Sequence, residues 1–156
     1  MTEQASSQAP VHVAINVQYI KDFSFESPNA PQVFVSTNAA PVLNMSVNVQ
    51  TRSLAENTYE VLLLLKLDAQ VESKAAFIAE LSYGGVFTVP PMSEENLKIV
   101  LLVEGPRLLF PFARSIIANA VREAGFPQIL INPIDFAGLY QANLQKLDNT
   151  AAAGTA

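Results

Sequence analysis

The stretch that most constrains how this chain folds is residues 106–126, PRLLFPFARSIIANAVREAGF. Apolar residues recur there at spacings of three and four, which places them on one broad face of a helix with a period of 3.6 residues. They are Leu109, Phe112, Ala113, Ile116, Ile117, Ala120, Val121 and Ala124. One thin layer of structure does not cover so wide a face, so we expect a sheet on one side of this helix and another subunit on the other.

Two residues define the end of this helix. Gly125 can take the left-handed conformation just after the last turn, and Pro127 prevents the helix from resuming. Pro111 leaves two interpretations open. It either lies in the first turn of the helix, where its missing N–H costs nothing, or kinks a longer helix.

The composition indicates one domain with more apolar surface than it readily hides. Half of the 156 residues are hydrophobic and 15% are charged, against about 25% charged in an average soluble domain. We expect a single domain over residues 11–147, a disordered arm over residues 1–10 and a flexible tail over residues 148–156. The apolar excess predicts either oligomerisation or an apolar binding surface.

The net charge and the cysteine content bear on which binding partners, disulfides and metal sites this chain can have. The formal net charge of −5 argues against nucleic acid, because binding phosphates needs clustered Lys and Arg. The absence of cysteine excludes disulfides and thiolate metal sites. The N-terminus lacks the features of a signal peptide, and no stretch has the roughly 20 apolar residues of a membrane span. We therefore expect a soluble cytoplasmic protein.

Alternating apolar and polar residues predict an antiparallel sheet of four strands. The strands are expected over residues 11–26, 43–50, 59–69 and 75–83. In the first, the apolar face carries the odd positions Ile15, Val17, Tyr19, Phe23 and Phe25. The middle of the third is apolar on both faces, so we expect it to be covered on both sides. Gly84-Gly85 permits a bulge or sharp bend after the fourth.

Helices are predicted after the strands, which gives the α+β class. Ser93, with Glu94 and Glu95 after it, begins a short helix that we expect to end near Val103, before Gly105-Pro106. Asn132-Pro133-Ile134-Asp135 marks the start of the last helix, with the proline in its first position. The apolar stripe of this helix contains Phe136, Leu139, Tyr140, Leu144 and Leu147.

The residues give little support for catalysis or metal binding. His12 is the only histidine and stands beside the arm without a plausible triad or metal partner. Gly84-Gly85 lacks the spacing and the lysine of a phosphate-binding loop. Glu94 and Glu95 are adjacent on a helix and point apart, so helix capping explains them better than paired catalysis. We expect no catalytic residue, no metal site and no cofactor.

Two patterns suggest binding surfaces, although a simpler interpretation exists for each. Asp22, Glu26 and Glu80 all occupy even positions, opposite the apolar face, with Ile78 among them. They form either an acidic docking patch or an ordinary solvated face. The apolar crossover near Phe34 and the stripe of the last helix form either a groove or ordinary core. Considered alone, the residues favour the simpler interpretation in both cases.

Five segments, in order, closely resemble the SecB family of bacterial protein-export chaperones. They are KDFSFESPNAPQVF at 21–34, YEVLLLLKLDA at 59–69, FIAELSYGGVF at 77–87, LLFPFAR at 108–114 and FPQILINPIDFAGLY at 126–140. The match runs from about Val11 to Leu147. The resemblance implies a tetramer, built as a dimer of dimers, that holds unfolded secretory precursors in the cytoplasm without ATP and passes them to the motor SecA. It implies neither catalysis nor a cofactor.

The resemblance also assigns roles to individual positions. It implies that SecA docks on Asp22, Glu26, Ile78 and Glu80, through a basic, zinc-bearing element whose metal belongs to SecA. It places the client-binding groove at Phe34, Leu43, Met45 and Val47, to which we add Phe136, Tyr140 and Leu144. It implies that Ala79, Leu81 and Tyr83 influence assembly. The chain has no tryptophan in the crossover, where some SecB proteins carry one, and its AAAGTA tail lacks the acidic and polar residues often seen in the family.

Two alternatives belong to other functional classes. A SecB-like chaperone can serve a toxin–antitoxin pair, although the acidic residues of the SecA patch argue against that role here. A small-molecule binding protein is a weaker alternative, because no convergent polar groups accompany the apolar stretches.

Overall fold

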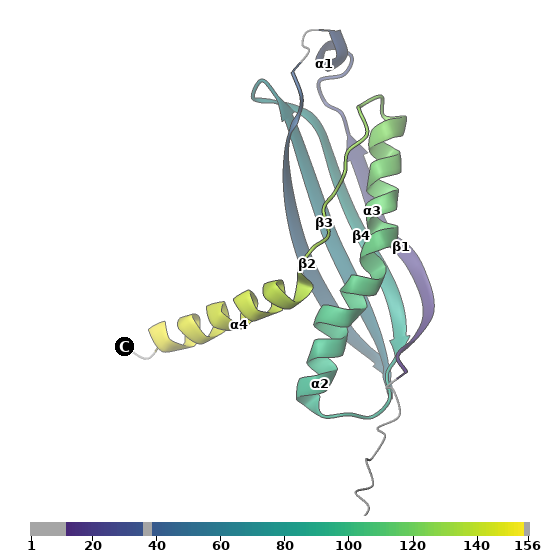
Figure 1. Cartoon of the computed structure of the whole chain (residues 1–156), viewed down its shortest axis with the longest axis vertical. Helices are drawn as coiled ribbons and strands as arrows, with labels where there is room; N and C mark the ends of the chain where they lie inside the picture. Colours follow the sequence, from purple (N-terminus) through teal and green to yellow (C-terminus); the bar gives the residue numbers. More distant parts are fainter. Residues whose placement is uncertain (1–11, 36–38, 155–156) are drawn as a thin grey trace, which may run out of the picture.

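The computed structural model describes residues 12–35 and 39–154, which form one antiparallel sheet and a set of helices (Figure 1). The strands are β1 (Ala14–Glu26), β2 (Val42–Ala55), β3 (Thr58–Val71) and β4 (Lys74–Thr88), in the order β1-β4-β3-β2. The helices are α1 (Gln32–Val35), α2 (Glu94–Ile99), the π-helical turn η1 (Val100–Glu104), α3 (Gly105–Glu123) and α4 (Phe136–Ala153). The predicted α+β fold is confirmed, while the arm expected at residues 1–10 lies outside the described residues.

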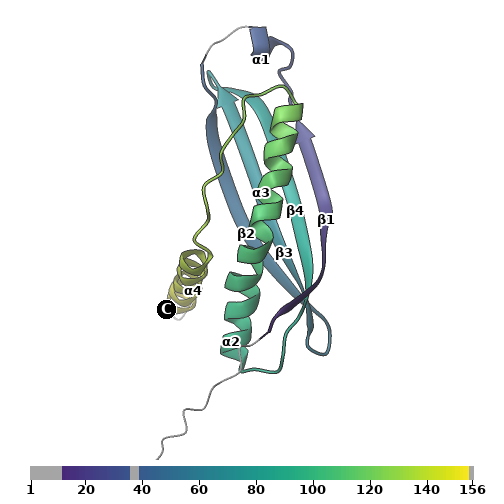
Figure 2. The ribbon, with the colours of Figure 1, turned by 45° about the vertical axis from the view of Figure 1, so that its right-hand side comes forward.

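The sheet has a helix face and an open face. In Figures 1 and 2, α2, η1 and α3 run along one face, which we call the helix face, and α4 projects from the body near α2. No described helix covers the opposite, open face. Leu62 of β3 points to the open face and is still buried, because neighbouring side chains of the sheet shield it. The expectation that β3 is covered by structure on both sides is therefore wrong for this chain alone.

The core forms where α3 packs on β3 and β4. Its fully buried side chains include Leu109, Ile117 and Val121 of α3, Val61 and Leu63 of β3, and Phe77, Leu81 and Phe87 of β4. The residues of α3 that face the sheet recur every four positions, as predicted for this helix. Phe112 does not belong to that stripe, since 51% of its surface is exposed.

The two predicted helices at residues 93–103 and 106–126 are joined into one run through η1. The break expected at Gly105-Pro106 is wrong. Pro106 lacks an N–H, and its ring would clash with the carbonyl four residues earlier in a regular α-helix, whereas the wider π turn before it relieves this conflict. Pro111 lies inside α3, so it is not in the first turn.

The helix ends follow the sequence signals at some positions and depart from them at others. Ser93 caps α2, its hydroxyl accepting a hydrogen bond from Asn96 N–H at 3.2 Å. Gly125 has φ of +92° after α3, as predicted. The last helix begins at Phe136 with Asp135 as its cap, three residues after the predicted start at Pro133. It continues to Ala153, so residues 148–153 are helical where the sequence suggested the start of a tail.

The pairing of β1 with β4 differs from the simple alternation expected. Its register shifts between Ile15 and Val17 and again between Ile20 and Asp22. Between these bulges the two faces are exchanged, so Tyr19 points to the open face. Gly84-Gly85 lies within β4, which continues through it to Thr88. The irregularity predicted at the glycines therefore occurs in the partner strand.

A buried carboxylate ties β1 to β3 across β4. Glu60 of β3 is only 6% exposed and accepts a hydrogen bond from the Tyr19 hydroxyl. Lys21 lies 3.1 Å and Arg52 lies 3.3 Å from the same carboxylate. Gly84 of β4 pairs with Tyr19, and a Cβ added to it would lie 2.7 Å from the Tyr19 ring. A side chain at this point would separate Tyr19 from Glu60.

These contacts change the protonation equilibria of both partners. The hydrogen bond from Tyr19 lowers the pKa of Glu60 by stabilising its charged form, against the opposing effect of desolvation, and the nearby Lys21 and Arg52 add to the lowering. Burial, followed by the carboxylate, raises the pKa of Tyr19 to about 12. Glu60 is therefore ionised, and Tyr19 protonated, at neutral pH.

We predict that Tyr19→Phe lowers the free energy of unfolding by about 1–2 kcal/mol at pH 7, because a buried carboxylate loses a donor. Because folding lowers the pKa of Glu60, its ionised carboxylate stabilises the folded state at pH values above the ordinary glutamate pKa. This stabilisation is lost as the pH falls through the lowered pKa. The difference between parent and variant should therefore shrink below about pH 4.5. Urea unfolding at several pH values would measure it. Tyr59→Phe is the control, and an equal loss in that variant would contradict the prediction.

Candidate functional site

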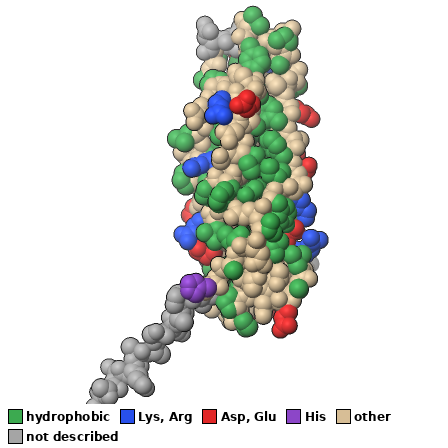
Figure 3. Space-filling model, turned by 90° about the vertical axis from the view of Figure 1, so that its right-hand side faces the viewer, with side chains coloured by type: hydrophobic (Ala, Val, Ile, Leu, Met, Phe, Trp, Pro, Cys, Tyr) green, Lys and Arg blue, Asp and Glu red, His purple; other side chains and the backbone are tan. Residues whose placement is uncertain are grey.

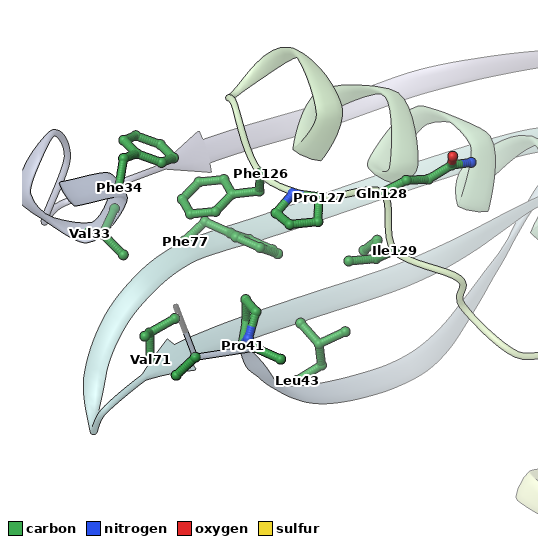
Figure 4. A pocket seen from close by; sticks show the side chains of 12 residues that line it. Val33, Phe34, Pro41, Leu43, Val71, Phe77, Phe126, Pro127, Gln128 and Ile129 are labelled. Carbon is green, nitrogen blue, oxygen red and sulfur yellow. The ribbon is translucent and has the colours of Figure 1, made fainter. Parts of the chain in front are cut away.

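An apolar hollow of about 540 Å³ opens at one end of the sheet, between the crossover, β2 and the segment that follows α3 (Figure 4). Its lining residues are Val33, Phe34, Ala39, Ala40, Pro41, Leu43, Val71, Phe77, Phe126, Pro127, Gln128 and Ile129. Three aromatic rings form one wall, with centroids 4.9 Å apart for Phe34 and Phe126 and 5.0 Å apart for Phe77 and Phe126.

The chemistry of this hollow suits apolar side chains of many shapes. Among the described residues that line the hollow, Gln128 alone has a polar side chain, so these walls offer little directional hydrogen bonding. Phe34 and Leu43 remain 47% and 40% exposed, which leaves their apolar surfaces accessible to a ligand. Such a site selects for hydrophobicity more than for shape.

A second apolar hollow, of about 300 Å³, lies between β2, η1 and α4. Its lining residues are Val49, Lys98, Leu102, Leu139, Tyr140, Asn143, Leu144 and Leu147. The predicted groove residues Tyr140 and Leu144 are thus brought together here. Met45 and Val47 lie on β2 between the two hollows, on the face that carries Leu43 and Val49 at alternate positions.

Phe136 does not belong to either hollow. It is 3% exposed and packs edge-on against Phe110 of α3, with ring centroids 6.1 Å apart. It anchors the start of α4 to the core and offers no surface to a ligand, so its assignment to the groove is corrected.

Sequence reasoning missed the segment after α3 as part of the site. Phe126, Pro127 and Ile129 line the first hollow, although their pattern suggested only the end of a helix. The available signal was a pair of large apolar residues in a stretch with no helical or strand period. Such residues in a connection either pack into the core or line a groove, and Phe126 does both.

The open face carries the predicted acidic patch. Asp22 lies opposite Ser82 and Glu26 opposite Ile78 in the β1–β4 pairing, with Glu80 between them on β4. Directly paired residues of antiparallel strands point to the same face. The three carboxylates and Ile78 are therefore neighbours on a surface that no described helix covers.

The patch contains one cation that sequence reasoning did not place there. Lys66 of β3 lies opposite Glu80, and their charged groups are 3.4 Å apart. Both side chains are about half exposed, so the pair adds little stability. Asp22, Lys66 and Glu80 border a shallow hollow of about 240 Å³.

Ala79, Leu81 and Tyr83 alternate with Ile78 and Glu80 along β4 and therefore lie on the helix face. All three are buried beneath α3, so they offer no exposed contact surface to another subunit. Exposed apolar side chains on β1 and α3 include Val17, Ile20, Leu108 and Phe112. Figure 3 shows hydrophobic groups gathered on one side of the molecule.

The described residues contain neither a cluster suited to a metal ion nor a membrane-spanning helix. No group of three or more His, Asp or Glu side chains in residues 12–35 and 39–154 is placed to hold a metal ion. Within the same residues, no helix has the length and apolar character needed to cross a membrane.

Comparison with known proteins gives consistent matches along most of the chain. The profile of the family described as "Preprotein translocase subunit SecB" matches residues 5–147. Protein-export protein SecB of Granulibacter bethesdensis is 48% identical over 149 residues, covering 90% of this chain and 87% of the relative. The SecB protein of Azorhizobium caulinodans is 44% identical over 158 residues, covering 99% of both chains.

A solved structure supports the fold at much lower sequence identity. It is a Mycobacterium tuberculosis SecB-like chaperone in complex with a ChAD peptide from an antitoxin. The structures agree with a TM-score of 0.63 at 12% identity, covering 78% of this chain and 87% of the other. At this identity the likeness establishes the shared fold alone.

Proposed function

Because the chain belongs to the SecB family of protein-export chaperones, we propose that it holds unfolded secretory precursors in the cytoplasm, without ATP, and delivers them to SecA. The observation that carries the holding function is the accessible hollow of about 540 Å³ with nearly all-apolar walls. Unfolded chains expose apolar side chains that such walls can accept. SecB is a chaperone family, and the proposed activity is binding without a chemical step.

Tight holding of a long client is expected from several weak sites. Each protomer offers two apolar hollows, one near α1 and one beside α4. Once one client segment is bound, the next segment binds at a high effective concentration. Discrimination against folded proteins follows, because a folded protein offers no extended apolar chain to occupy several sites.

We assign SecA docking to the open face, at Asp22, Glu26, Ile78 and Glu80. The exposure of these carboxylates, and the lack of a covering helix among the described residues, support this assignment. A basic docking element would be attracted by the patch, and charge complementarity speeds encounter and suppresses wrong partners. Lys66 reduces the negative charge around Glu80, so Asp22 and Glu26 are expected to contribute strongly.

We assign assembly into a dimer of dimers to the exposed side of α3 and to β1. Leu108, Phe112, Val17 and Ile20 supply the apolar surface that such contacts need. Ala79, Leu81 and Tyr83 then influence assembly indirectly, because they support α3 from beneath.

To test the groove, we predict that Leu43→Ser weakens client binding on the order of tenfold, since about 1–2 kcal/mol of apolar contact is lost. Leu43 is a cleaner choice than Val47, which also packs on the core. The control is Leu54→Ser, a leucine of β2 with 44% exposure that does not line either hollow. Suppression of aggregation of a denatured precursor would be measured. An equal loss of aggregation suppression in both variants would contradict the assignment of the groove.

To test docking, we predict that Glu80→Lys folds and holds clients but binds SecA at least tenfold more weakly, because attraction becomes repulsion. Added salt should weaken the parent interaction more than that of the variant. Glu95→Lys makes the same change of charge on exposed α2 and should leave affinity unchanged. Isothermal titration at low and high salt would decide, and unchanged affinity in Glu80→Lys would refute the site.

To test assembly, we predict that Phe112→Ser reduces the mass found by light scattering, because it removes a large apolar contact from the proposed interface. Leu147→Ser, an exposed apolar substitution on α4, should leave the mass unchanged. Retention of the parent mass by Phe112→Ser at micromolar concentration would place the interface elsewhere.

A further inference from the structure

Glu80, within the acidic patch of the open face, already has a cation of this chain beside it. Lys66 of β3 stands opposite Glu80 of β4 in the antiparallel pairing, and its Nζ lies 3.4 Å from Oε1 of Glu80. Directly paired residues share one face of a sheet, so the lysine reaches the same surface as the carboxylates. A cation that docks on Glu80 has to displace Lys66 or share the carboxylate with it.

The hollow beside this ion pair is where a side chain of a docking partner would meet the three charges. Asp22, Lys66 and Glu80 all border the shallow hollow of about 240 Å³ on the open face. The two carboxylates attract a cation that enters, whereas Lys66 repels it. Lys66 thus cancels half of the negative charge that the two carboxylates bring to this hollow.

The Lys66–Glu80 pair is loose enough to be exchanged. The two side chains are 48% and 54% exposed, and an exposed pair of this kind adds little to stability. Its length of 3.4 Å exceeds the roughly 2.7–2.9 Å of a charge-assisted hydrogen bond. Breaking it therefore costs the fold little, and the role of Lys66 is better sought in binding than in stability.

Lys66 also has a second carboxylate within reach. Asp68 lies two residues further along β3, opposite Ile78, and so shares the open face. Two residues of a strand span about 7 Å, and the flexible four-carbon stem of a lysine can move its ammonium group over such a distance. Release from Glu80 does not leave Lys66 without an acidic neighbour.

We propose that Lys66 competes with the docking partner's cation for Glu80 and thereby limits the affinity of the acidic patch. This inference rests on the proposed docking of SecA and adds a residue that controls its strength. The matching partner is a basic element, one cation of which enters between Asp22 and Glu80 and displaces Lys66. Because each docking event replaces one ion pair with another, the net gain at Glu80 is small and the complex dissociates readily.

The competition also makes docking more selective. An isolated cation gains little, since it only replaces the pair that Glu80 already has. A basic element with several cations gains further attraction from Asp22 and Glu26, to which Lys66 is not paired. A repulsive charge within a binding surface discriminates in this way against weak, non-specific partners. Lys66 therefore favours a multiply charged docking element over single lysines on other proteins.

The test is a double-mutant cycle on the full-length protein, with SecA affinity measured by isothermal titration at low salt. Lys66→Gln should tighten binding about threefold, the size expected when one exposed competing ion pair is removed. In the Glu80→Gln background the same substitution should tighten binding by less than about 1.5-fold, because the carboxylate under competition is gone. Tightening of equal size in both backgrounds would reveal a general effect of net charge and would overturn the proposal.

Two control variants separate competition from other effects of the substitution. Lys66→Arg keeps the competing charge and should not tighten binding. Lys98→Gln removes the same charge and an exposed ion pair with Glu94, 3.2 Å long, from α2, and should leave SecA affinity unchanged. Weaker binding by Lys66→Gln would show that Lys66 assists docking, and unchanged binding would show that it has no part in docking. Either result would overturn the proposal.

Glu80→Gln by itself distinguishes a failure of this inference from a failure of the docking assignment. Weaker SecA binding by Glu80→Gln, with no gain of affinity in Lys66→Gln, would refute the competition and leave the docking site in place. Parent affinity in Glu80→Gln would refute docking at Glu80, and the competition for it as well. Suppression of precursor aggregation should be the same in all these variants, because Lys66 and Glu80 lie on the face opposite the apolar hollows.

Discussion

The burial of one side of α3 against β3 and β4 is the interaction on which the rest of the structure depends. Leu109, Ile117 and Val121 meet the apolar residues of β3 and β4 and are fully buried there. Because a single long helix and its connections cover only this face, the opposite face stays open and β2 stays uncovered at the margin. The surfaces proposed to bind SecA and clients are consequences of this incomplete coverage.

The position of β1 depends on a second, polar interaction. Tyr19 reaches the buried carboxylate of Glu60 because Gly84, its partner on β4, leaves space for the tyrosine ring. The bulges on either side of this contact allow Tyr19 to point to the open face while Phe23 and Phe25 return to the core. The second bulge also sets the side to which Asp22 and Glu26 point. The acidic patch therefore depends on the register that surrounds the Tyr19–Glu60 contact.

The alternation of side chains along a strand separates the two proposed binding surfaces. On β4, Ile78 and Glu80 face outward while Ala79 and Leu81 support α3. On β2, Leu43 and Met45 lie on the helix face, where Leu43 lines the first hollow, while Asn44 and Ser46 face the open side. One sheet can thus present an apolar surface and an acidic surface at once, without a second domain. Substitutions at neighbouring positions are expected to affect different partners, because neighbours lie on opposite faces.

The sequence by itself determined the α+β class, the order of the elements, and the helix ends at Ser93 and Gly125. Each follows from local periodicity or from the backbone preference of one residue. Only the tertiary structure decided the continuous helix through η1, the bulges of β1, the buried position of Phe136 and the lining of the hollow by Phe126 and Ile129. These features depend on contacts between residues far apart in the chain, such as Tyr19 with Glu60 and Phe34 with Phe126. Periodicity gives the direction of a side chain on its own element, whereas the neighbour it meets depends on how the elements pack.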